Sequence, residues 1–179
     1  MVKSAVFAAG LVATIGLVGC SQDPADPQPS ATSGDISGVQ SFSDLSQDHT
    51  KDNVDYPQSP PVGGEHDPTW ISCNGEVYTQ PVRSENAVHS MEHGAVWVTY
   101  LPDLSSKDVQ SLADRVSGEP YSFMSPYPDQ SSPVVLTAWG LQLAVDDVSD
   151  ERIDAFLTAY RQGPQTPEPG AACDGGVMP

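Results

Sequence analysis

The sequence predicts an α+β domain in which two helices pack on one face of a small antiparallel sheet. Short runs of β-branched and aromatic residues indicate strands, and two segments with apolar residues at helical spacing indicate amphipathic helices. Their order along the chain is strand, helix, strand, strand, helix, which is typical of helices gathered on one face of a largely antiparallel sheet. A ferredoxin-like layout is the simplest arrangement of this kind, and we expect a long, loop-rich N-terminal half before it.

The chain begins with a segment that has the pattern of an export signal. Lys3 is followed by an apolar run over residues 5–18, which is too short to cross a bilayer well, and the sequence becomes polar directly after Cys20. The ending Leu-Val-Gly-Cys resembles the lipobox of bacterial lipoproteins, in which the cysteine is lipidated. We therefore expect residues 1–20 to be a lipoprotein signal peptide that anchors the protein, through Cys20, to the extracytoplasmic face of the cell membrane. An ordinary signal peptide and a short anchor helix are the alternatives.

The next segment, residues 21–55, predicts a disordered acidic tether. It contains seven aspartates and a single lysine, and it has few large apolar side chains. Such a composition does not bury enough apolar surface to offset the entropy of folding. We expect His49, which lies in this segment, to be solvated. Residues 56–179 then form a single α+β domain.

The chain is strongly acidic. Its formal net charge is −17, and loss of Lys3 with a signal peptide would bring it to −18. Nucleic acid and anionic lipid head groups are therefore poor partners. The charge does not distinguish a cation-binding protein from a well-solvated surface protein.

Cys73 and Cys173 remain once Cys20 is assigned to lipidation. In an oxidising compartment we expect them to form a disulfide, which would close a loop of about 100 residues and contribute about 4 to 5 kcal/mol in the chain-entropy model. Metal thiolates or a redox pair are the alternative, and the sequence lacks the C-x-x-C spacing typical of both.

Helix ends and strand runs are clearest in the second half of the chain. Ser105 and Ser149 have the character of N-caps, and Gly118 and Gly163 stop the apolar stripes that follow them. The expected strands cover residues 95–100, 121–124, 133–139 and 141–145.

Candidate ligands gather in the first half of the domain. His66 lies in a Pro- and Gly-rich loop, and residues 85–94 predict a short helix with Ser84 as its N-cap and Gly94 after its end. On this helix His89 and His93 fall at about 200° and 240°, one turn apart and away from the core stripe.

Two imidazoles at i, i+4 converge as metal ligands do. Glu92, at about 140°, lies beside them as an extra ligand or as a group that orients a ring. Met91 falls on the core stripe. The sequence therefore predicts a metal site formed by His66, His89 and His93, while a solvated pair of histidines is the plainer alternative.

Six short motifs follow one another along the chain after the tether. They are Tyr-Pro-x-x-Pro-Pro from residue 56, Gly-Glu-His-Asp-Pro (64–68), Val-His-x-x-Glu-His-Gly (88–94), Ser-Pro-Tyr-Pro (125–128), Thr-Ala-Trp-Gly (137–140) and Pro-Glu-Pro-Gly-Ala-Ala-Cys (167–173). In this order they resemble the bacterial domain of unknown function 3105 family. The resemblance covers nearly all of the chain after the tether, and it implies an exported or membrane-attached protein without an established activity. The family's characteristic histidines correspond to His66, His89 and His93, and the position of Met91 is usually aliphatic.

Three functions compete. The first is a lipid-anchored, cell-surface protein that binds copper or zinc through three histidines. Met124 would shift the preference to Cu⁺ if it reached the site as a soft ligand, and a methionine packed in the core is the alternative for this residue. The second is a metal-free module whose His-Glu-His face binds another envelope protein. The third is a zinc hydrolase, because residues 89–93 match H-x-x-E-H. The small domain favours a binding protein over an enzyme, and we assign no catalytic residue.

Overall fold

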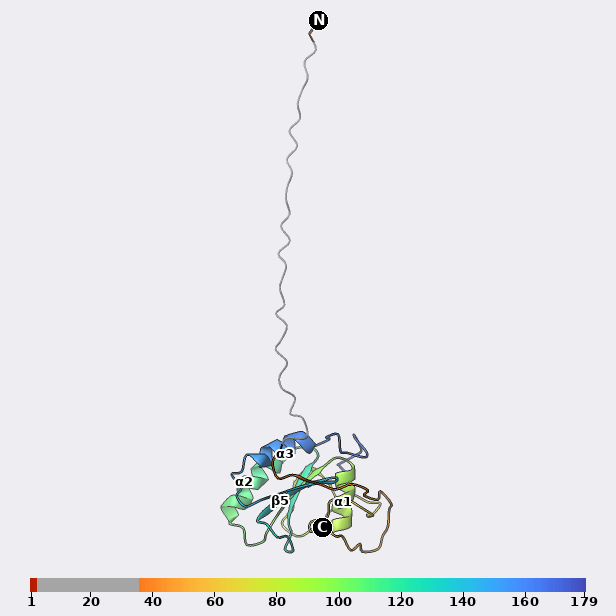
Figure 1. Ribbon diagram of the computed structural model, residues 1–179, viewed down its shortest axis with the longest axis vertical. Coiled ribbons are helices and arrows are strands. Elements are labelled where there is room, and N and C mark those ends of the chain that lie inside the picture. Colours follow the sequence, from red (N-terminus) through yellow and green to blue (C-terminus); the bar gives the residue numbers. More distant parts are fainter. Residues whose placement is uncertain (3–35) are drawn as a thin grey trace. The chain divides into compact units, whose positions relative to one another are not determined.

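A six-stranded mixed sheet forms the centre of the domain, with strand order β1-β6-β5-β3-β4-β2 (Figure 1). The computed structural model describes residues 1–2 and 36–179, and the folded domain comprises the second of these ranges. The strands are β1 (Gln40–Ser41), β2 (Asn74–Val77), β3 (Val96–Tyr100), β4 (Ser122–Pro126), β5 (Val134–Ala138) and β6 (Leu141–Val145). The helices are α1 (Ser84–Glu92), α2 (Ser106–Val116) and α3 (Arg152–Tyr160).

The α+β class is confirmed, but the small antiparallel, ferredoxin-like sheet is wrong. β1, β6, β5 and β3 pair antiparallel in turn, whereas β4 pairs parallel with both β3 and β2. Parallel neighbours need a crossover connection, and α2 provides the one between β3 and β4. From β3 to α3 the expected helices and strands are present, with three strands between α2 and α3 where the predicted order had two. β1 and β2 were not predicted, and neither was the parallel pairing of β4.

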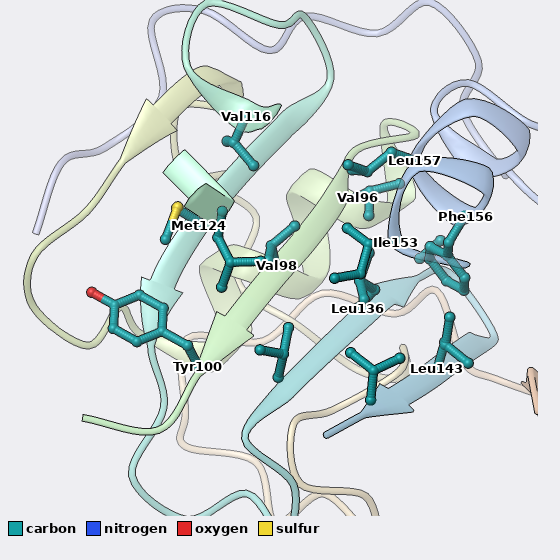
Figure 2. Packing of buried hydrophobic residues seen from close by; sticks show 14 of the residues in the cluster. Val96, Val98, Tyr100, Val116, Met124, Leu136, Leu143, Ile153, Phe156 and Leu157 are labelled. Atoms are coloured by element: carbon teal, nitrogen blue, oxygen red, sulfur yellow. The ribbon is translucent and has the colours of Figure 1, made fainter. Parts of the chain in front are cut away.

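The two faces of the sheet are covered differently. Val96, Val98 and Met124 pack on the face that α2 and α3 cover (Figure 2), and the alternate residues Trp97 and Phe123 pack with the core residues of α1 on the other. α2 and α3 are the two helices expected on one face, but the described domain has three helices and not two. The third helix, α1, covers the opposite face together with long loops.

Residues 36–55 do not form the free tether that the sequence predicted. β1 pairs with β6, Phe42 N donates to Gly140 O, and Leu45 packs against the core on the α1 side. A few apolar side chains at wide spacing are enough to hold this polar segment on the domain. Residues 21–35 and the predicted signal peptide with Cys20 lie outside the described residues, apart from residues 1–2.

Two further predictions concern covalent structure and the membrane. The disulfide between Cys73 and Cys173 is confirmed. Among the residues that the structure describes, no helix is both long and apolar enough to cross a membrane.

Candidate metal site

Helix α1 carries His89 and Glu92, and His93 is its C-cap. The helix is buried along almost its whole length. Residues 85–92 are all buried, so the face with His89 is not the solvated face that the helical angles predicted. Residues 64–71 and the C-terminal segment cover it: Ile71 N donates to Asn86 O at 3.2 Å, and Glu168 N donates to Glu92 O at 3.0 Å. A loop on each side thus encloses the histidines.

Gly94 ends the helix where the sequence predicted. Its φ of +100° is in the left-handed region, and a Cβ at this position would lie 2.2 Å from Gln162 Nε2. Gln162 donates to the His93 carbonyl through the same nitrogen. The tight end of α1 therefore sets the position of His93, which caps the helix.

All four histidines of the chain meet beside α1. The ring of His66 lies 5.0 Å from that of His89, and the ring of His89 lies 4.5 Å from that of His93. His49 stacks on His89 at 5.1 Å with an interplanar angle of 1°, and it meets His66 edge to face at 4.8 Å. Among the described residues, His49, His66, His89 and Glu92 each offer a ligand atom within 4.8 Å of the other three.

Three of the rings are fixed by backbone carbonyl groups. A carbonyl oxygen only accepts, so each Nδ1 atom in such a bond carries a proton. In the neutral ring Nε2 then holds a free lone pair, which is the state that binds metal. The Nδ1 atoms of His66, His89 and His93 donate to Gly64 O (2.8 Å), Asp67 O (2.7 Å) and Ala172 O (2.6 Å).

The Nε2 atoms of these rings face other acceptors. His66 Nε2 lies 2.9 Å from Glu92 Oε2, and His89 Nε2 lies 2.9 Å from His93 Nε2. Neither pair forms a hydrogen bond if the rings are neutral, because each atom then presents a lone pair to another lone pair. Each pair needs a cation, either a proton or a metal ion.

Glu92 and His66 stabilise each other's charged forms. Burial lowers the pKa of His66, but the hydrogen bonds to the Glu92 carboxylate and the Gly64 carbonyl outweigh burial, so the pKa is raised above 6.5. Burial raises the pKa of Glu92, and the hydrogen bond to His66 outweighs it in turn, so that pKa is lowered. In the absence of metal, the proton of this pair resides on His66.

His89 behaves in the opposite way. Burial, opposed by the hydrogen bond to Asp67 O and reinforced by the charges of His93 and His66, lowers its pKa to about 4. His89 is therefore neutral at physiological pH and presents an Nε2 lone pair to the centre of the cluster.

The cluster differs from the predicted three-histidine site in two ways. His66 and His89 lie together, and Glu92, expected as an extra ligand or as a group that orients a ring, offers a carboxylate oxygen within the group of four. His93 adjoins the cluster through His89 and lies outside the group of four. His49, predicted to be solvated, belongs to it.

The two methionines follow the core pattern. Met91 is buried on the α1 side, as predicted. Met124 is buried on the opposite face of the sheet, among Val96, Val98 and Leu136 (Figure 2), because alternate residues of β4 point to opposite faces. Met124 is therefore not a ligand of this cluster and packs in the core, which was the alternative that the sequence left open.

His49 was missed because composition alone assigned its segment to the tether. The signal in the sequence was the spacing of Ile36, Val39 and Leu45, three apolar residues of a polar segment that pack against the core. The ring of His49 lies on a strand-like stretch, where Thr50 N donates to His66 O and His66 N donates to Asp48 O.

Comparison with known proteins agrees with the resemblance in the motifs. The model of a family described as "Protein of unknown function (DUF3105)" matches residues 48–175, more than half of the chain. The chain belongs to this family, and the matched region includes all four histidines. No curated protein and no solved structure matches the chain significantly.

Proposed function

We propose that this member of the DUF3105 family binds a divalent copper or zinc ion through His49, His66, His89 and Glu92, with His93 in contact with the site through His89. The observation that carries the proposal is the pair of acceptor-to-acceptor contacts, His66 to Glu92 and His89 to His93, at 2.9 Å each. A divalent cation bound by the four ligands replaces the proton between His66 and Glu92, and it takes up the Nε2 lone pair that His89 otherwise presents to His93. Metal binding should therefore release a proton.

The donor set indicates which ions fit. Imidazole nitrogen and carboxylate oxygen suit Cu²⁺ and Zn²⁺, and Cu²⁺ binds a given set of nitrogen ligands more tightly in the Irving–Williams order. The cysteines of the domain are joined in a disulfide and Met124 lies on the far face of the sheet. Cys73, Cys173 and Met124 therefore offer no soft sulfur ligand for Cu⁺ at the described site.

Burial argues against the two other functions that the sequence left open. A protein-binding face made of His89, Glu92 and His93 would need exposed side chains, whereas these residues are 5%, 2% and 4% exposed. A hydrolase would need a substrate to reach the ion past the same covered residues. We therefore propose metal binding at the cell surface, with Cys20 as the lipid anchor, and no catalytic role.

The test is metal binding by the full-length protein. Protein purified without chelator and offered equimolar Cu²⁺ and Zn²⁺ should retain about one ion per chain, with Cu²⁺ in excess over Zn²⁺. His66→Ala combined with His89→Ala should abolish retention, and Met91→Leu, a buried change on the same helix, should leave it intact. Full retention by the double variant would refute the proposed ligands.

A further inference from the structure

We propose that the metal ion is exchanged through one ligand, His49, and that the protein hands the ion to, or takes it from, an external imidazole donor such as a histidine-bearing peptide. This inference rests on the metal binding proposed above. It distinguishes a transfer protein from one in which the metal only stabilises the fold.

The four candidate ligands are not equally accessible. The side chain of His49 is 45% exposed, whereas the side chains of His66 and Glu92 are 0% and 2% exposed. His89 is 5% exposed. An incoming donor therefore meets the ion on the side of His49, and the other three ligands remain covered while exchange takes place.

The segment that carries His49 is attached at few points. We call residues 42–55 the strap, and none of its residues is buried. Phe42 N, which donates to Gly140 O, and the Leu45 side chain attach its start to the domain. Backbone bonds near His49 join it to His66, and Val54 N donates to Glu85 Oε1 at 2.8 Å. Arg83, which pairs with Glu85, also donates to the Lys51 and Asp52 carbonyls. A segment with exposed side chains and few anchors opens at low free energy.

His49 also lies farther from Glu92 than His66 does, and its ring has fewer hydrogen bonds than the rings of the other histidines. His49 Nε2 lies 3.8 Å from Glu92 Oε2, compared with 2.9 Å for His66 Nε2. Unlike the other three histidines, His49 has no carbonyl bond to Nδ1 among the interactions of the described residues. Its ring is held by stacking on His89 and by the strap backbone.

Exchange is then a ligand substitution without oxidation or reduction. The lone pair of an incoming neutral imidazole bonds to the ion, the bond from the ion to His49 Nε2 breaks, and the freed His49 ring is available to a solvent proton. Further donors bind the ion on this same exposed side, and the bonds from the ion to His66, His89 and Glu92 break in turn as the ion leaves.

Two tryptophans make the exchange measurable. The ring of Trp70 lies 5.1 Å from that of His93 and 5.8 Å from that of His89, and the ring of Trp139 lies 5.8 Å from that of His66. Bound Cu²⁺ should quench the fluorescence of these rings, and release of the ion to excess EDTA should restore it. The rate of recovery measures metal release from the full-length protein.

Free imidazole should change the rate of Cu²⁺ release in opposite directions in the unmodified protein and in His49→Ala. In the unmodified protein it should accelerate Cu²⁺ release, because it competes with His49 for the ion. In His49→Ala, release without imidazole should be at least about tenfold faster than in the unmodified protein. Removal of a group that only supports a metal ligand already lowers metal affinity by about tenfold or more, and removal of a ligand should lower it at least as much. Added imidazole should slow this release, because it fills the position that His49 leaves.

The controls separate this inference from the metal site itself. Lys51→Ala, an exposed change in the strap, should release Cu²⁺ at the unmodified rate, and imidazole should not slow release from His66→Ala or His89→Ala, whose positions are covered. An unchanged release rate in His49→Ala, or equal rescue of His66→Ala, would overturn the inference while metal binding stands. Failure of the unmodified protein to bind Cu²⁺ would overturn the proposed function and this inference together.

Discussion

At the scale of single residues, the site depends on which nitrogen of each histidine carries the proton. Carbonyl oxygens of Gly64, Asp67 and Ala172 hold the proton on Nδ1 of three rings, and this leaves the Nε2 atoms to bind a cation. None of these carbonyl partners has a recognisable side-chain signal. Sequence patterns identified the histidines, but the tautomer that makes them ligands is set by backbone groups that come together only in the fold.

The first prediction concerns the pH dependence of metal binding. The pKa of His66 is raised, so its proton competes with the metal below that raised value, whereas the pKa of His89 is lowered to about 4 and His89 remains available. As the pH falls from about 8, the upward shift in melting temperature with Cu²⁺ or Zn²⁺ should therefore begin to shrink above pH 6.5, where the raised pKa of His66 lies, and should be smaller still at pH 5. When metal is at a hundred times Kd, binding stabilises the fold by about 2.7 kcal/mol.

The metal-free protein provides the control for this prediction. Because the pKa of folded His66 is raised, its bond to Glu92 stabilises the fold below the unfolded pKa of about 6.5, and this contribution is lost as the pH rises through the folded pKa. Histidine ring signals in NMR should show His66 titrating above 6.5 and His89 remaining neutral down to about pH 4. A melting shift with metal that is equal at pH 5 and pH 8 would contradict competition at His66.

At the scale of elements, α1 shows what sequence periodicity can predict and what it misses. The helix, its core residues and the glycine at its end followed from the sequence, because local spacing and capping specify them. The burial of its second face did not, since the covering segments come from residues 64–71 and from the C-terminal end of the chain. Angles around a helix identify the side that a sheet covers, but not whether loops cover the other side.

The second prediction tests the end of α1. Gly94→Ala should lower the free energy of unfolding by more than about 1 kcal/mol, because the new Cβ meets Gln162 and the φ of +100° strains an L-residue. It should also weaken metal binding, since Gln162 contacts the His93 carbonyl. Denaturant unfolding and the copper titration measure the two effects.

Gly118→Ala is the matched control for this change. Gly118 ends α2 with a φ of +74°, and a Cβ there meets no atom within 4 Å. The variant therefore has the backbone strain without the clash, and Gly118 follows a helix that covers the other face of the sheet. Equal losses of metal affinity in the two variants would show that the end of α1 does not position the site.

At the scale of the whole molecule, the site joins distant parts of the chain. Its ligands come from the strap, the loop with His66 and helix α1, and the C-terminal segment covers them. The domain start was misplaced by the sequence because seven aspartates concealed a segment that the fold needs. Parallel pairing of β2 with β4 was missed for a related reason: strand direction depends on long-range connections and leaves little mark on local sequence.

The third prediction concerns the disulfide. Cys73 N donates to Cys173 O at 2.8 Å, and the neighbouring Ala172 carbonyl accepts from His93. Changing both cysteines to serine should cost about 2 to 5 kcal/mol of stability and should also weaken copper binding, because the C-terminal segment is released. Denaturant unfolding and copper titration of the variant test both effects. Lower stability with unchanged copper affinity would show that the segment stays in place without the disulfide.

The fourth prediction concerns the anchor. Cys20 lies outside the described residues, and its role rests on the lipobox-like ending of an apolar run that is too short to span a bilayer well. Lipid chains contribute about 0.8 kcal/mol for each buried methylene, so lipidation would hold the protein stably at the membrane. Cys20→Ala should therefore move the protein from the membrane fraction to the soluble fraction, measured by immunoblotting.

Because the described domain begins at residue 36 and has its own core, the released protein should retain its melting temperature and its copper binding. Full retention in the membrane fraction would show that the apolar run, and not a lipid on Cys20, is the anchor.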